Sequence, residues 1–272
     1  MSILPESINP YVFLSVGSAS AMLYGAAKGG FGAGISLLAL PLMIYACGGD
    51  ARLAAGVLLP LLIACDYVVM VHWRFRWDRR SVLSLLPGAL VGIAIGGGLL
   101  WLFARLGDAR GKDAASGAMT LAIGLVSLCF VILRAASALR GVARAYQPRP
   151  WHGAGFGAAA GVTSTLAHAA GPVVTIYLLP QRMGKGVYVA STVLFFWVIN
   201  QVKLVPYLAL GMVHGGSLWA SALLLPAVVS GAALGVFLHE RVNQRAFEGI
   251  VYALLALTGG HLAVEGALML WG

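Results

Sequence analysis

The feature that most constrains this chain is a series of apolar stretches, each long enough to cross a lipid bilayer as a helix. About 20 apolar residues are needed to span the ~30 Å hydrocarbon core. The sequence is 60% hydrophobic and 10% charged, whereas soluble domains carry roughly 25% charged residues. The chain is therefore predicted to be an all-helical integral membrane protein. Six stretches reach the full spanning length: 53–71, 82–104, 114–134, 187–210, 217–238 and 247–265.

Four shorter apolar segments flank two breaks in the apolar pattern. The first break, Lys28-Gly29-Gly30-Phe31-Gly32-Ala33-Gly34, separates 11–27 from 35–47. The second break, Ser164-Thr165-Leu166-Ala167-His168-Ala169-Ala170-Gly171-Pro172, lies between 153–168 and 172–180. Unpaired backbone groups inside a bilayer cost several kcal/mol each, so such breaks persist only where protein, water or a ligand satisfies them. Interrupted segments at matching places in two halves indicate the binding site of a transporter.

The two halves of the chain share a pattern of Pro and Gly residues. Pro87 and the Gly92-x-x-x-Gly96 spacing recur at a constant offset as Pro226 and Gly231-x-x-x-Gly235. We therefore expect two transmembrane repeats, residues 11–135 and 153–266, joined by a basic cytoplasmic linker over 136–152. Chance similarity between two stretches rich in Gly, Ala and Leu is the alternative explanation.

The Lys and Arg residues of the predicted loops are unevenly distributed between the two sides of the membrane. Cytoplasmic loops carry the excess, which predicts that both termini are periplasmic. An odd number of segments in each half inverts the second repeat, giving 8–10 transmembrane or re-entrant helices in two inverted repeats. The net charge of +9 is explained by orientation and by contacts with anionic lipid, so we expect no nucleic-acid partner. One side carries Arg74, Arg76, Arg79, Arg80, Arg134, Arg140, Arg144, Arg149, Arg182, Lys185, Arg241 and Arg245, against Arg52, Arg105, Arg110 and Lys112 on the other.

Ionisable side chains inside membrane segments are costly and are functional candidates by default. Asp66 and Lys203 occupy equivalent positions in the two halves, so one interpretation is an internal ion pair between them. The other is that Lys203 helps to neutralise an anion while Asp66 tunes it or carries a proton. Lys28 either extends to the interface or faces the break. His168 is a candidate to donate to an anion, to relay a proton or to bind a carbonyl.

The two breaks also precede new helices, whose N-termini present unpaired N–H groups that suit an anion. On the helix that follows the second break, Asn200 and Lys203 share one face with Tyr207. The six histidines and three cysteines show no ligand spacing, so no metal or cofactor is expected. Asp66 and His168 are the candidates for coupling or ion pairing. The expected substrate-binding residues are Lys28, Gly29, Gly30, Phe31, Gly32, Gly34, Ser164, His168, Gly171, Pro172, Asn200 and Lys203.

Taken in order, these motifs resemble the TauE/SafE family of sulfite exporters over about residues 12–265. The resemblance rests on the first break with Pro41, on Pro87-Gly88 with Gly92, on 167–172 with Tyr177-Leu178-Leu179-Pro180, and on Asn200-x-x-Lys203. It implies a permease of bacterial inner membranes for small sulfur-containing anions such as sulfite, sulfoacetate or other organosulfonates. The commoner family pattern has a Gly-rich run at both breaks. Here the second break carries His168 and Gly171-Pro172, which suggests a subgroup with a different substrate.

The sequence therefore favours a secondary transporter, not an enzyme, that moves a small oxyanion by alternating access. Proton coupling and transport down the anion's own gradient both remain open, as do the direction and homo-oligomer formation. One alternative is a carrier or channel for another small anion, such as a carboxylate. An intramembrane enzyme using Ser164 and His168, or an assembly protein, is an alternative from a different class.

Overall fold

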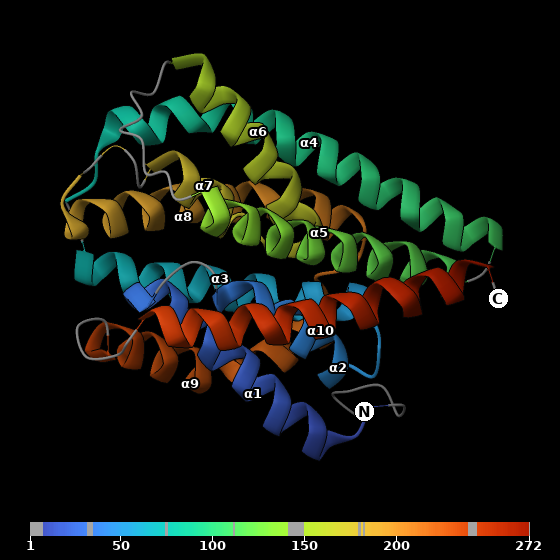
Figure 1. The fold of residues 1–272 in the computed structure, drawn as a ribbon. Coiled ribbons are helices and arrows are strands. Elements are labelled where there is room, and N and C mark those ends of the chain that lie inside the picture. Colours follow the sequence, from blue (N-terminus) through green and yellow to red (C-terminus); the bar gives the residue numbers. More distant parts are fainter. Residues whose placement is uncertain are drawn as a thin grey trace.

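The computed structural model describes residues 8–31, 35–73, 76–110, 112–140, 150–178, 181, 183–238 and 244–271 (Figure 1). Every regular element within these ranges is helical, with η1 a π-helix and η2 a 3₁₀ turn. The first half contains α1 (Pro10–Ala26), η1 (Ala27–Phe31), η2 (Ile35–Leu38), α2 (Ala39–Ala46), α3 (Ala51–Trp73), α4 (Arg79–Arg110) and α5 (Lys112–Arg140). The second contains α6 (Pro150–Ala167), α7 (Gly171–Leu178), α8 (Lys185–Ala209), α9 (Gly215–Leu238) and α10 (Gln244–Trp271).

The six long spans predicted from hydropathy correspond to α3, α4, α5, α8, α9 and α10, and the four short segments to α1, α2, α6 and α7. Within the described residues, α3, α4, α5, α8 and α9 are long and apolar enough to cross a membrane. Leu255–Trp271 of α10 is a shorter apolar helix by the same measure. The prediction of an all-helical, multi-pass membrane protein is confirmed.

Polar side chains fix the starts of several helices. The Asn9 side chain accepts the N–H of Tyr11 at 3.0 Å, directly before α1. Asp50 Oδ1 accepts two N–H groups of α3, each at 2.9 Å. Asp78 Oδ2 accepts the N–H of Ser81 at 3.1 Å at the start of α4. Each carboxylate or amide satisfies N–H groups that have no partner within the helix, so these residues define where the helices begin.

Three pairs of helices, α1–α9, α4–α6 and α5–α10, pack with their backbones nearly in contact. A Cβ at Gly25 or Gly29 would collide with carbonyl oxygens of α9, and one at Gly231 or Gly235 with carbonyls of α1. The same arrangement joins α4 to α6, where Gly92 lies on a carbonyl of α6. Small residues spaced four apart permit this approach in lipid, where the hydrophobic effect does not drive helices together. Gly92, Gly231 and Gly235 therefore lie where the facing helix leaves no room for a side chain.

The helices α3 and α8 form the centre of the bundle and pack against one another. Both also contact η1, which holds the first residues of the first break. Of the candidate spans, α3 has the most buried apolar window, 61%. The bundle therefore places the breaks beside the two central helices, far from lipid.

Candidate functional site

Both breaks lie where the apolar pattern of the sequence indicates. The first four residues of the first break, Lys28–Phe31, lie in the π-helix η1, and the described chain continues with η2 and then α2. Gly32 and Gly34, two of the predicted binding residues, lie outside the described residues. At the second break α6 ends at Ala167, and α7 begins at Gly171 with Pro172 as its second residue. His168 has φ = 50° in between. This left-handed conformation is rare for a residue with a side chain and is a mark of local strain, which clusters at functional sites.

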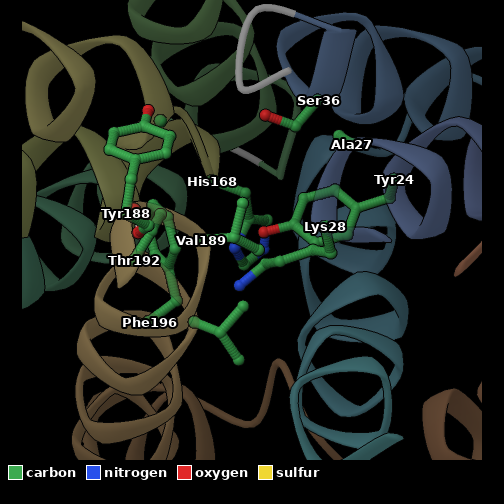
Figure 2. Close-up of a pocket in the computed structure, with 11 residues that line it drawn as sticks. Tyr24, Ala27, Lys28, Ser36, His168, Tyr188, Val189, Thr192 and Phe196 are labelled. Atoms are coloured by element: carbon green, nitrogen blue, oxygen red, sulfur yellow. Dashed lines mark hydrogen bonds between the residues drawn. The ribbon is translucent and has the colours of Figure 1, made fainter. Parts of the chain in front are cut away.

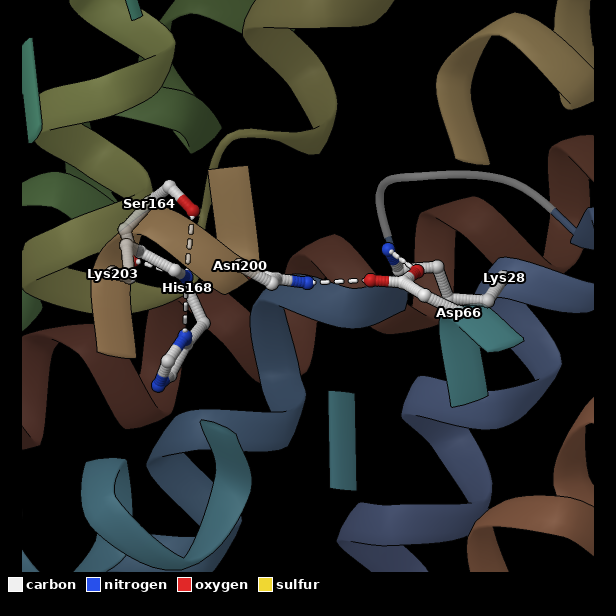
Figure 3. A network of polar contacts seen from close by, with 6 residues as sticks. All are labelled: Lys28, Asp66, Ser164, His168, Asn200 and Lys203. Atoms are coloured by element: carbon white, nitrogen blue, oxygen red, sulfur yellow. Dashed lines mark hydrogen bonds and ion pairs between the residues drawn. The ribbon is translucent and has the colours of Figure 1, made fainter. Parts of the chain in front are cut away.

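The first break carries a buried ion pair (Figure 3). The Lys28 ammonium, on η1, pairs with Asp66 Oδ1 on α3. Asn200 Nδ2, on α8, donates to the other carboxylate oxygen of Asp66 at 2.6 Å. The Lys28 and Asp66 side chains are 6% and 0% exposed. Asp66 therefore joins the first break to both central helices.

A second cluster forms around Lys203, at the left of Figure 3. Lys203 Nζ donates to Ser164 Oγ at 2.9 Å, to the Ser164 carbonyl at 3.2 Å and to His168 Nδ1 at 3.1 Å. His168 Nε2 lies 3.1 Å from the Ala55 carbonyl oxygen, which can only accept. The imidazole therefore carries its proton on Nε2 and accepts at Nδ1. The hydroxyl of Tyr207 donates to the Thr165 carbonyl at 2.8 Å.

The predicted direct ion pair between Asp66 and Lys203 is wrong. Each of these residues instead contacts the break in its own half: Asp66 pairs with Lys28, and Lys203 binds Ser164 and His168. The two side chains point toward the break in their own half instead of toward one another. Asn200 takes the place between them and binds the carboxylate.

The described part of the chain shows an imbalance of charge around the breaks. Lys28 has a carboxylate partner, whereas the hydrogen-bond partners of Lys203 are a serine, a backbone carbonyl and a neutral imidazole. Lys203 is 0% exposed. A buried ammonium without a carboxylate is unfavourable in a low-dielectric interior, so an anion bound nearby would be stabilised.

A cavity of about 60 Å³ lies between the two breaks and α8 (Figure 2). By the same measure a single water needs about 10–15 Å³, so the cavity accommodates several waters or one small solute. Lys28, His168 and Gly171 line it, together with the unpredicted Tyr24, Ser36, Tyr188, Thr192 and Phe196. The ring centroid of Phe196 lies 4.0 Å from Lys28 Nζ, a cation–π contact.

The predicted binding residues thus divide into two groups. Lys28, His168 and Gly171 line the cavity, whereas Ser164, Asn200 and Lys203 form the hydrogen-bonded layer behind it. In the first break, Gly29 packs against α9, and Gly30 and Phe31 belong to the π-helix η1.

Sequence reasoning missed the cavity residues of α8. Tyr188, Thr192 and Phe196 precede Asn200 at successive intervals of four, so all four share one helix face. That spacing was the available signal. It is easily taken for ordinary packing, because Tyr188 and Phe196 resemble the core aromatics of any apolar helix.

Comparison with known proteins gives one family. The sequence model described as sulfite exporter TauE/SafE matches residues 18–262. No curated protein and no solved structure matches the chain. The match covers both breaks, both lysines and all the helices that frame them. The chain belongs to the TauE/SafE family of sulfite exporters and is a multi-pass membrane transport protein.

Proposed function

We propose that this protein is a secondary transporter that moves a small sulfur-containing oxyanion, such as sulfite, sulfoacetate or another organosulfonate, by alternating access. Its place is a bacterial inner membrane. The observation that carries the proposal is the buried Lys28 in the wall of a small cavity, with a second buried lysine, Lys203, behind that wall.

The cavity offers an oxyanion both charge and hydrogen-bond donors. Lys28 supplies the charge, and Tyr24 lines the same space with Tyr188 and Thr192. The Thr192 hydroxyl donates to the Tyr188 carbonyl, and the Tyr188 hydroxyl is paired with Thr175. Gly171, the first residue of α7, brings the positive end of a helix dipole to the cavity wall. Backbone and hydroxyl donors of this kind favour a compact anion with several oxygen acceptors.

The membrane potential decides what coupling the transporter needs. An inside-negative potential of 100 mV drives each negative charge outward with about 2.3 kcal/mol, so export of an anion proceeds without another gradient. Uptake against this potential requires coupling, for which Asp66 and His168 are the candidate proton carriers. We propose export without obligatory coupling as the simpler mode.

The geometry gives little support to the alternative of an intramembrane hydrolase. A nucleophilic Ser164 would need a neighbouring base to accept its proton. The His168 nitrogen nearest to that role, Nδ1, instead accepts from Lys203, and Nε2 is engaged with the Ala55 carbonyl. Ser164 Oγ likewise accepts from Lys203.

Solute flux in proteoliposomes tests the proposal. The purified protein is reconstituted and offered sulfite, thiosulfate, sulfoacetate, taurine, acetate and phosphate, with and without an imposed pH gradient. We expect saturable flux of the sulfur anions, abolished by Lys28→Met and retained by Arg76→Met, which removes an exposed cation outside the site. Flux of acetate or phosphate alone would discard the sulfur-anion substrate, and absence of any flux from folded protein would discard the transporter.

A further inference from the structure

The Lys28–Asp66 ion pair places an internal anion at the point where a substrate anion would bind. Lys28 lines the cavity, and its ammonium is already paired with the carboxylate of Asp66. A substrate that reaches Lys28 therefore competes with Asp66 for one ammonium group. Asp66 would be useful to the transport cycle if it neutralises Lys28 while no substrate is bound.

Both members of the pair keep other partners when they separate. Asp66 retains the hydrogen bond from Asn200 at 2.6 Å. Lys28 retains the ring of Phe196, 4.0 Å from its ammonium, and lies near the ring of Tyr24, at 5.7 Å. It also lies in a π-helical turn, a backbone form that is frequent at functional sites. The contacts thus allow Lys28 to change partner without leaving either group isolated.

The charges of the described residues around the breaks show what Asp66 contributes. Lys28, Lys203 and Asp66 together carry one net positive charge when both lysines are protonated, and a bound monoanion makes the set neutral. Without Asp66, the empty carrier would hold two buried positive charges. Uncompensated charge inside a membrane protein is strongly unfavourable, so an empty carrier of that kind would resist the rearrangement that exposes the site to the other side.

We propose that Asp66 is the internal counter-anion of Lys28: it takes the ammonium when the substrate leaves and thereby allows the empty carrier to reorient. This inference rests on the proposed anion transport. It assigns to Asp66 a role in the return step of the cycle, distinct from carrying a proton, and it makes Asn200 the residue that positions the carboxylate.

Replacement of Asp66 by Asn should affect the return of the empty carrier but not the transport of bound substrate, and two flux assays distinguish these steps. Net efflux requires the empty carrier to return, whereas exchange of labelled for unlabelled sulfite does not. In proteoliposomes, Asp66→Asn should lower net sulfite efflux by about tenfold or more and leave exchange within about threefold of the parent. The KM for exchange should fall, because the substrate no longer competes with the carboxylate for Lys28.

A matched control lies on the same helix. Asp50→Asn also removes one carboxylate from α3, but it does so at the helix start, where Asn caps as well as Asp. This variant should leave both net efflux and exchange unchanged. If it reduces net efflux selectively, the effect of Asp66→Asn is not specific to the Lys28 pair and the proposal is overturned.

The remaining outcomes distinguish the rival roles of Asp66. An equal fall in efflux and exchange would overturn the counter-anion role, as would intact net efflux that merely loses its response to a pH gradient. If Asp66→Asn does not fold, Asp66→Glu is the variant that tests the proposal. We expect Asp66→Glu to lower net efflux more than exchange. An equal fall in both would count against the proposal. Absence of sulfur-anion flux in the parent protein would instead refute the proposed function.

Discussion

At the scale of single residues, the two buried lysines of this transporter are held in different ways. Lys28 is neutralised by Asp66, whereas Lys203 is held by Ser164 and His168 and is completely buried. Breaking a buried ion pair from one side typically costs about 3–5 kcal/mol, because the partner is left charged and unpaired. The two lysines should therefore respond differently to the same substitution.

Replacing Lys28 by Met should weaken sulfite binding by about tenfold or more and lower the free energy of unfolding by about 3–5 kcal/mol, since Asp66 is left alone. The double variant Lys28→Met/Asp66→Asn should regain most of that stability but none of the binding. Thermal unfolding in detergent and sulfite titration of the same preparations measure the two effects. Recovery of binding together with stability would show that Lys28 acts only through the fold.

Replacing Lys203 by Met should lower thermal stability less than Lys28→Met does. The substitution removes hydrogen bonds to Ser164 and His168, worth about 1.5–3 kcal/mol when charged, but also removes a buried charge without a carboxylate. Thermal unfolding of both variants under identical conditions makes the comparison. A larger loss for Lys203→Met would mean that its ammonium is compensated by a group outside the described residues.

At the scale of the helices, close backbone contact between α1 and α9 and between α4 and α6 holds the frame around the breaks. Gly88 and Gly92 of α4 and Gly157 and Gly161 of α6 fit against carbonyl oxygens of the facing helix. Each of these interfaces brings together one helix from each half of the chain. The helices around each break are therefore packed against helices of the other half of the chain.

Two glycines of α4 offer a matched test of this packing. A Cβ at Gly92 would collide with the Ala158 carbonyl, whereas a Cβ at Gly98 would meet nothing within 4 Å. Gly92→Ala should therefore destabilise the protein by about 1–3 kcal/mol through overpacking. Gly98→Ala should be neutral or stabilise by up to about 1 kcal/mol, because Ala loses less backbone entropy in a helix. Thermal unfolding distinguishes them, and equal effects would contradict the close contact.

The sequence predicted these helices well because bilayer thickness sets their length and Gly or Pro interrupts them. Both breaks and the candidate residues Lys28, Asp66 and His168 followed from the cost of polar groups in lipid. Which side chains contact one another did not follow. The matching positions of Asp66 and Lys203 suggested an ion pair between them. Which side chain each one contacts depends on the rotation of the helices and on the reach of Asn200, and the hydropathy of the sequence does not reveal either. The cavity face of α8 was missed for the same reason.

At the scale of the whole molecule, several of the main helix contacts have a counterpart when the two halves are exchanged. α1 packs on α9 as α6 packs on α4, and α3 packs on α9 as α8 packs on α4. The pairs α5–α10 and α3–α8 correspond to themselves. The correspondence is incomplete within the described residues, because α4 packs on α5 and α2 packs on α3, whereas α9–α10 and α7–α8 are not among the main contacts. The inverted repeat therefore stays a prediction.

The ends of several helices gather at the two ends of the bundle. In Figure 1 the end of α4 and the last turn of α10 lie at one end of the bundle, at the right of the view. The junction of α3 with α4 and the start of α8 lie at the opposite end. Arg79 begins α4 and Lys185 begins α8 at this second end, which we therefore expect to be cytoplasmic.

Cysteine labelling tests that orientation. In a background with Cys47, Cys65 and Cys129 replaced by Ala, Arg79→Cys should react with a membrane-impermeant maleimide only from the cytoplasmic side, and His214→Cys only from the periplasmic side. Both positions are exposed; Arg79 is the first residue of α4, and His214 directly precedes α9. Exchange of the two labelling sides would invert the predicted orientation of the protein and place both termini on the cytoplasmic side. Labelling of both from one side would contradict the inverted repeat itself, because Arg79 and His214 begin equivalent helices, α4 and α9, in the two halves.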